Sequence, residues 1–202
     1  RSRGLGDVYK RQSKALFGMV PMRKVGSNYN STAQSQYAIA NGLASNIFHG
    51  DLVTISAGNI TPVATTTDYA IGVFMGCEYT DPTTKQPTFS RHFPANTSSA
   101  IGNPVGFVVD DPYASFMIQA DASVTAGDIN SQNFEVTLGA GSTVTGNSGF
   151  GIKAASRATA TKAVRPIAMV HEPGNALTGA DGAFPKLEVK IVQHWMKRQA
   201  TA

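Results

Sequence analysis

Residues that could perform chemistry are few in this chain, and they are scattered along it. No two of its histidines have the spacing of metal ligands, although there are four of them: His49, His92, His171 and His194. His171-Glu172 begins like the helix of a zinc protease, but Pro173 and Gly174 prevent the helix that such a site requires. The sequence therefore predicts no metal site.

Other catalytic patterns also fail at a specific residue. Ser148 lacks the Gly-x-Ser-x-Gly pattern of a nucleophile elbow, because Phe150 stands where the last glycine should be. The glycine-rich loop 139–149 lacks the Gly-Lys-Ser/Thr ending of a phosphate-binding loop. Cys77 follows an apolar run and precedes Glu78, which favours a buried structural thiol over a reactive one. We expect no enzymatic activity, no catalytic residues and no cofactor.

The composition points to a protein that contacts other proteins. Only 15% of its 202 residues are charged and 42% are hydrophobic, and much of the remainder is Ser, Thr, Asn and Gly. A surface of this kind packs against another protein with few charges to desolvate. The chain is long enough for one domain with a sizeable core. We expect no membrane contact, because no apolar run approaches the length that spans a bilayer.

The net charge of +4 is not evidence for nucleic-acid binding. Residues 1–12 (RSRGLGDVYKRQ) resemble translated sequencing-adapter DNA, and we interpret them as a non-native artefact. They hold four basic residues and one acidic residue, which leaves 13 basic and 12 acidic residues in the rest of the chain. The sequence therefore predicts no direct contact with nucleic acid.

Short apolar runs separated by turn residues indicate an all-β fold. The range 47–76 contains three such runs, at 52–55, 59–63 and 70–75, which predict a meander. Pro62 has no N–H for a ladder, so we expect its strand to lie at an edge or to carry a bulge there. Gly72 inside the third run predicts a bend or a close backbone approach.

Further strands follow along the chain. The ranges 105–110 and 114–120 are expected to form a hairpin through Asp111, Pro112 and Tyr113, with Asp111 initiating the turn. Four other predicted strands follow, at 133–138, 150–154, 164–170 and 186–195. Many short antiparallel strands without helical periodicity favour a small barrel or a sandwich.

The segment before the meander, residues 23–45, is polar and contains little that could form a hydrophobic core. Residues 23–45 are rich in Asn, Ser and Gln, and contain isolated tyrosines at Tyr29 and Tyr37. This composition fits either disorder or an arm that a partner orders. We therefore expect four parts in the chain: the artefact 1–12, an extended N-terminal arm 13–46, a single β domain 47–197 and a tail 198–202.

Candidate contact residues come from the arm and from one short strand. In 88–93, Phe89, Arg91 and Phe93 alternate on one face, which is either core with a cation reaching solvent or an interface patch. The candidate partner contacts are Arg23, Asn28, Tyr29, Tyr37, Phe89, Arg91 and Phe93.

Taken together, several stretches resemble the small all-β head decoration, or cement, proteins of tailed bacteriophages. The similar pieces lie at 18–23, 47–53, 89–95, 109–112, 139–146 and 191–194. The resemblance implies a virion structural protein on the outer capsid surface, assembled in the cytoplasm of a bacterial host. It implies the major capsid protein as partner, with self-association into a dimer or trimer on the shell.

A carbohydrate- or receptor-binding module of the tail, or another head–tail component, is the alternative interpretation. Exposed aromatic side chains gathered in one groove would favour the tail module.

Overall fold

The computed structural model describes residues 14–25, 34–66, 68–95, 102–178 and 182–197. Short strands dominate this part of the chain, and two short 3₁₀ helices, η3 (Ala126–Asp128) and η5 (Trp195–Lys197), accompany them. The strands are β1 (Val20–Lys24), β2 (Gln34–Ala38), β3 (Ile47–Phe48), β4 (Leu52–Ser56), β5 (Asn59–Pro62), β6 (Gly72–Thr80), β7 (Pro87–Ser90), β8 (His92–Phe93), β9 (Val105–Val109), β10 (Ala114–Gln119), β11 (Asn133–Thr137), β12 (Gly151–Ala158), β13 (Val164–Met169) and β14 (Lys186–Ile191). The predicted all-β class is confirmed.

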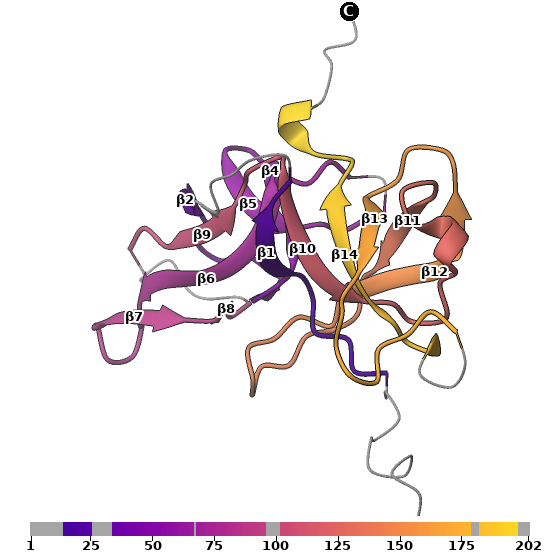
Figure 1. Ribbon diagram of the computed structural model, residues 1–202. Coiled ribbons are helices and arrows are strands. Elements are labelled where there is room, and N and C mark those ends of the chain that lie inside the picture. The colour runs from indigo at the N-terminus through magenta and orange to yellow at the C-terminus, as the bar shows by residue number, and fades with distance from the viewer. Residues whose placement is uncertain (1–13, 26–33, 67, 96–101, 179–181, 198–202) are drawn as a thin grey trace, which may run out of the picture.

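Two larger sheets and one two-stranded pair contain these strands (Figure 1). The first sheet has the order β1-β10-β14-β13-β11-β12. The second has the order β2-β9-β6-β4-β5, with β7 also paired to β6, and β3 pairs with β8. The pairings within them are antiparallel, and the sheets are not closed into a barrel, so the fold is sandwich-like.

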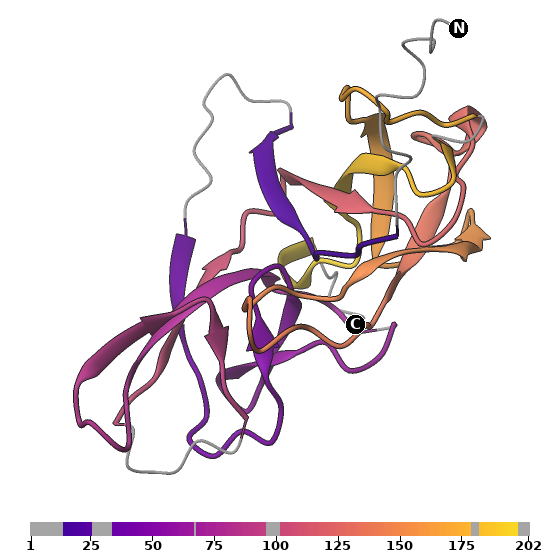
Figure 2. The ribbon, with the colours of Figure 1, turned by 90° about the horizontal axis from the view of Figure 1, so that it is seen from below.

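Each sheet has its own hydrophobic core, and the second sheet contributes to both. The first core packs Phe116, Phe134 and Val189 from the first sheet. The second core packs Phe74 and Phe93 with their neighbours. Figure 2 shows the two groups of strands side by side, joined where the chain crosses between them.

Alternation along the central strands divides the side chains between these cores. In β6, Val73 belongs to the first core and Phe74 to the second; in β9, Val109 and Val108 are divided in the same way. Successive side chains of a strand point to opposite faces, so one strand can fill two cores.

The meander forms as expected. β4 and β5 form a hairpin whose loop residues, Ala57 and Gly58, have positive φ values of 48° and 79°. Pro62 lies in β5, which is an edge strand of its sheet. Gly72 lies so close to β9 that an added Cβ would be 2.2 Å from the carbonyl oxygen of Val109. The predictions for both residues are confirmed.

One expectation about strand pairing is wrong. The strands β9 and β10 do not form a hairpin, because β9 pairs with β2 and β6 while β10 pairs with β1 and β14. Asp111 does initiate a turn, since its Oδ1 accepts a hydrogen bond from the Tyr113 N–H at 2.8 Å, but this turn directs the chain from one sheet into the other.

The described parts of 13–46 do not form a separate arm. They contain β1 and β2, which pair with β10 and β9 at the edges of the two sheets. An edge strand is held largely by backbone hydrogen bonds, so its side chains need little hydrophobic patterning. Three regions assigned from the sequence lie outside the described residues: 1–12, 26–33 and 198–202.

Candidate functional site

The three alternating residues Phe89, Arg91 and Phe93 have different environments. Phe93 is fully buried in the second core, where its ring meets that of Tyr79 edge-on at 5.8 Å between centroids. Phe89 is 72% exposed, and Arg91 is also exposed. A bend at Arg91 separates β7 from β8, so the alternation does not continue across it. Phe93 is therefore core, and only Phe89 and Arg91 are available to a partner.

The glycine-rich loop lies beside this bend. A Cβ added to Gly146 would be 2.9 Å from the Cβ of Arg91, and the His49 N–H donates to the Gly146 carbonyl at 2.9 Å. The same loop carries Val144, whose side chain is 93% exposed. Phe89, Arg91 and Val144 together are called the loop–bend surface below.

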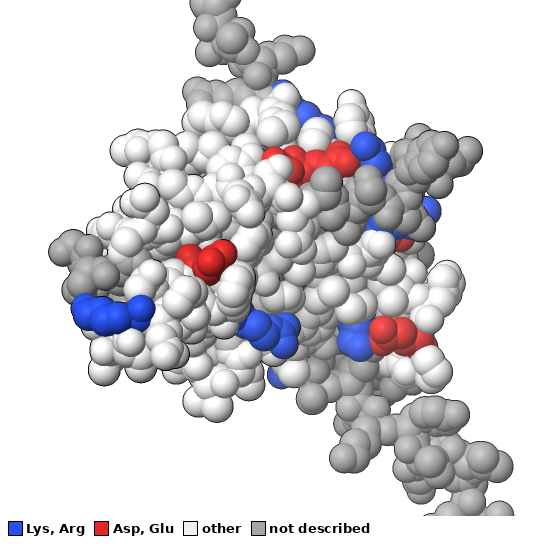
Figure 3. All heavy atoms as spheres, turned by 90° about the vertical axis from the view of Figure 1, so that its left-hand side faces the viewer, with Lys and Arg blue, Asp and Glu red and all other residues white. Residues whose placement is uncertain are grey.

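Few charges accompany this surface. Figure 3 shows the side of the molecule where β6 and β7 project, and most of the described atoms there belong to uncharged residues. His49 is half-buried beside the loop, and burial together with the positive charge of Arg91 lowers the pKa of its imidazole. The lowered pKa favours the neutral imidazole of His49, and Arg91 brings a positive charge against Gly146 of the loop.

Asp51 holds the glycine-rich loop 139–149 in place against the β3–β4 turn through its carboxylate. Its Oδ2 accepts a hydrogen bond from the Phe48 N–H at 2.8 Å, and its carboxylate also takes one from the Ser148 hydroxyl. Oδ1 is buried without a partner among the described residues. Burial raises the pKa of Asp51 to about 6, although both hydrogen bonds act in the opposite direction.

Ser148, His49 and Asp51 are the residue types of a hydrolytic triad, but their hydrogen bonds have a different order. The Ser148 hydroxyl contacts the carboxylate directly, without an imidazole between them, and accepts the Phe150 N–H at 2.9 Å. Ser148 is also only 2% exposed. The arrangement ties the loop to the β3–β4 turn, and a nucleophile would need the histidine between serine and carboxylate.

Close backbone packing adds to this tie. A Cβ at Gly18 would be 2.5 Å from the Cβ of Ser148 and 2.7 Å from the Gly50 carbonyl oxygen, and a Cβ at Gly141 would collide with the Phe48 ring. Four of the stretches on which the family resemblance depends, 18–23, 47–53, 89–95 and 139–146, therefore meet here, although they are far apart in the sequence.

The remaining predicted contact residues are not part of the loop–bend surface. The Tyr37 hydroxyl donates to Asp110 Oδ2 at 2.7 Å, and burial and this bond raise the pKa of Tyr37 to about 12. Arg23 forms an ion pair with Glu188 at 2.8 Å, with 55% of its side chain exposed. Asn28 and Tyr29 lie outside the described residues.

The sequence reasoning missed Val144. The available signal was a large β-branched residue standing alone among Gly, Ser and Thr, in a loop that offers it no strand partner.

Cys77 has the environment predicted for it. Its side chain is buried, its thiol lies 3.5 Å from the His92 carbonyl oxygen, and burial raises its pKa to about 12. A thiolate is therefore strongly disfavoured at neutral pH.

Among the described residues, no group of three or more His, Cys, Asp or Glu side chains is placed to hold a metal ion. In the same part of the chain, no helix has the length and apolar character needed to cross a membrane. Comparisons with family models, with curated proteins and with solved structures found no match to this chain.

Proposed function

We propose that this protein is a structural component of a tailed-phage virion, which binds the outside of the capsid shell and bridges neighbouring capsid subunits. The observation that carries the proposal is the loop–bend surface. Phe89, two residues before Arg91, is 72% exposed, and Val144, two residues before the Gly146 that packs against Arg91, is 93% exposed. Aromatic residues and arginine are enriched in protein interfaces, which fits Phe89 and Arg91, and Val144 adds exposed apolar area to them.

The support beneath this surface suits the role. The loop that carries Val144 is held to the β3–β4 turn by the His49–Gly146 hydrogen bond and by the Ser148–Asp51 contact. A loop fixed before binding loses less conformational entropy when a partner arrives. The sequence pieces that resemble the decoration proteins also meet at this place, which is why we assign the capsid-binding role to it.

In this proposal the major capsid protein is the partner, and dimers or trimers of the chain assemble on the shell. Each contact can be modest, because many copies bound to one closed shell act together. Direct contact with nucleic acid or membrane has no part in the proposed role.

The test uses empty shells assembled from the proposed partner, a tailed-phage major capsid protein. Purified protein is mixed with shells, sedimented and quantified, and Phe89→Ser and Val144→Ser are compared with the unchanged chain. Each substitution should weaken shell binding by at least about tenfold. Thermal midpoints should stay within about 2 °C, since both side chains are exposed.

Met196→Ser is the matched control, because Met196 is 57% exposed on η5, at the end of the molecule away from β7 and β8 (Figure 1). It should bind shells like the unchanged chain. The proposal fails if the unchanged protein does not sediment with shells, or if all three variants bind equally well.

A further inference from the structure

A groove of about 430 Å³ is lined by three parts of the chain. They are the β4–β5 hairpin, the segment that follows β5, and the 3₁₀ helix η5. It is separate from the loop–bend surface. The side chains that matter for its chemistry are Thr54, Ser56, Thr61, Asp68, Tyr69 and Trp195.

Hydroxyl groups form the β-sheet side of this groove. Thr54 of β4 lies directly opposite Thr61 of β5, and Ser56 follows Thr54 two residues later on the same face. Leu52, two residues earlier on this face, is buried in the first core. The face therefore changes from core to hydroxyl-lined groove within one strand.

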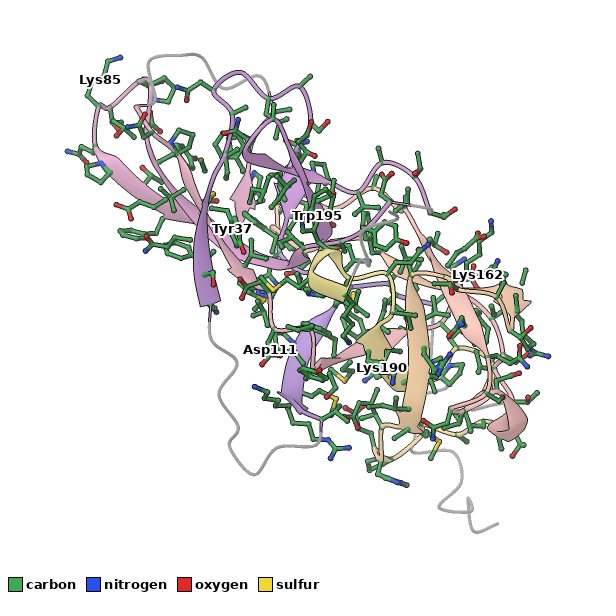
Figure 4. The ribbon with its side chains drawn as sticks, turned by 90° about the horizontal axis from the view of Figure 1, so that it is seen from above. Tyr37, Lys85, Asp111, Lys162, Lys190 and Trp195 are labelled. Carbon is green, nitrogen blue, oxygen red and sulfur yellow. The ribbon has the colours of Figure 1, made fainter. Side chains whose placement is uncertain are left out.

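Two aromatic residues border the groove, and one backbone bridge sets their positions. The Ala70 N–H donates to the Gln193 carbonyl at 2.9 Å, and the Trp195 N–H donates to the Ala70 carbonyl at 2.8 Å. This bridge holds Trp195 next to the residue that precedes Ala70, which is Tyr69. The Trp195 residue is 39% exposed, and Figure 4 shows it beside the strands of the second sheet.

Asp68 supplies a fixed carboxylate. Its Oδ2 accepts the N–H groups of Ala64 and Thr65 at 3.1 and 3.0 Å, and its Oδ1 accepts the Thr65 hydroxyl at 2.8 Å. Burial alone would raise the pKa of Asp68, but these hydrogen bonds outweigh it and hold the pKa below its ordinary value. Asp68 is the one charged residue among the described residues that line the groove.

We propose that this groove binds a neutral oligosaccharide. A pyranose ring has one apolar C–H face, which packs on the flat rings of Trp195 or Tyr69, and a rim of hydroxyls, which bond to Thr54, Thr61 and Asp68. The carboxylate repels phosphates and other anions, and the described lining residues include no lysine or arginine to hold them. The inference goes beyond the proposed capsid role and does not depend on it; an aromatic groove is also the feature named above as favouring a carbohydrate-binding module of the tail.

Trp195 makes the test direct, because it is the single tryptophan of the chain. Its fluorescence is followed while maltohexaose, cellohexaose and chitohexaose are added separately at millimolar concentrations. We expect at least one of them to shift the emission saturably to shorter wavelength and to protect Trp195 from quenching by acrylamide. A printed array of neutral glycans extends the search to other linkages.

Variants locate the binding. Tyr69→Ala and Thr54→Val should each raise Kd for the active hexasaccharide by about threefold to tenfold. Trp195→Phe, measured by calorimetry, should weaken binding in the same direction. Phe89→Ser, an exposed aromatic outside the groove, is the matched control and should leave Kd unchanged.

Two results would overturn the inference. One is the absence of any response to the three hexasaccharides together with no binding on the array. The other is binding that the Tyr69, Thr54 and Trp195 variants leave intact, since the sugar would then bind elsewhere. Shell sedimentation of the same groove variants should be normal, so a failure here is distinguishable from a failure of the capsid role.

Discussion

Asp51 is a buried acid whose environment gives it an unusual titration. The residue is 2% exposed, and burial raises its pKa from 3.8 to about 6. The folded protein therefore holds this proton more tightly than the unfolded chain does. Asp51 therefore makes the protein more stable as the pH falls from about 6 to 4. Above pH 6, where the side chain is ionised in the folded protein, its burial lowers the free energy of unfolding by about 3 kcal/mol.

Asp51→Asn should remove this pH dependence. An amide oxygen still accepts the Phe48 N–H, and the Ser148 hydroxyl can accept from the amide nitrogen. The variant should therefore be at least as stable as the unchanged protein at pH 7.5, with a smaller advantage at pH 4.5. Urea unfolding at a series of pH values measures the difference between the two proteins.

Ser148→Ala provides the companion measurement, because it removes a hydrogen bond that favours the ionised carboxylate. It should move the titration of Asp51 to higher pH. His194 changes the stability with pH in the opposite direction in the unchanged protein and in both variants. Burial lowers the pKa of His194, so its contribution to stability is lost as the pH falls below about 6.5. If Asp51→Asn leaves the pH profile unchanged, Asp51 is not the buried acid described above.

At the level of strands, Gly72 shows what a close approach requires. A Cβ there would be 2.2 Å from the Val109 carbonyl oxygen, and 2.8 Å from a methyl carbon of Val108. Backbone cannot rotate away as a side chain can, so Gly72→Ala should force β6 and β9 apart.

The expected cost of Gly72→Ala is about 2–3 kcal/mol in the free energy of unfolding. Gly127→Ala is the control, since its nearest neighbour is a hydroxyl 3.9 Å away and its φ is not positive. Chemical denaturation of both variants gives the comparison. Equal stabilities would mean that β6 and β9 have room that the structure does not show.

The strand predictions succeeded where the evidence was local. The β4–β5 hairpin, the edge position of Pro62 and the strand β14 within the predicted range 186–195 are properties of a few neighbouring residues. Partners are not local. The pattern at 105–110 is the same whether its neighbour is β10 or β6, because periodicity gives the faces of a strand without naming the strand beside it.

The candidate contact residues could be predicted only in part, because their environments also depend on long-range packing. Alternation placed Phe89, Arg91 and Phe93 on one face, but a single bend at Arg91 sends Phe93 into a core and leaves the other two outside. The part played by Val144 depends on the packing of Gly146 against Arg91, across more than fifty residues of sequence. Such a long-range contact has no signal in either stretch alone.

The molecule as a whole has two cores that share one sheet. Neighbouring residues in β4, β6 and β9 alternate between them: Leu52 and Val53, Val73 and Phe74, Val109 and Val108. If the side chains of either core unpack, one face of these strands is exposed to water, and the strands that also bound the other core lose their support. Two cores joined by a shared layer should therefore lose structure together, in contrast to domains joined by a linker.

We predict a single cooperative unfolding transition, and equal sensitivity of that transition to either core. Phe134→Leu reduces the first core and Phe93→Leu the second, and both side chains are fully buried. Each substitution should lower the free energy of unfolding by about 1–3 kcal/mol, because a buried aromatic ring is replaced by a smaller side chain. Calorimetry and native-state hydrogen exchange of the two variants measure this. If Phe93→Leu splits the transition and exposes only the amides of the second sheet, the shared layer does not couple the cores and the two sheets are independent units.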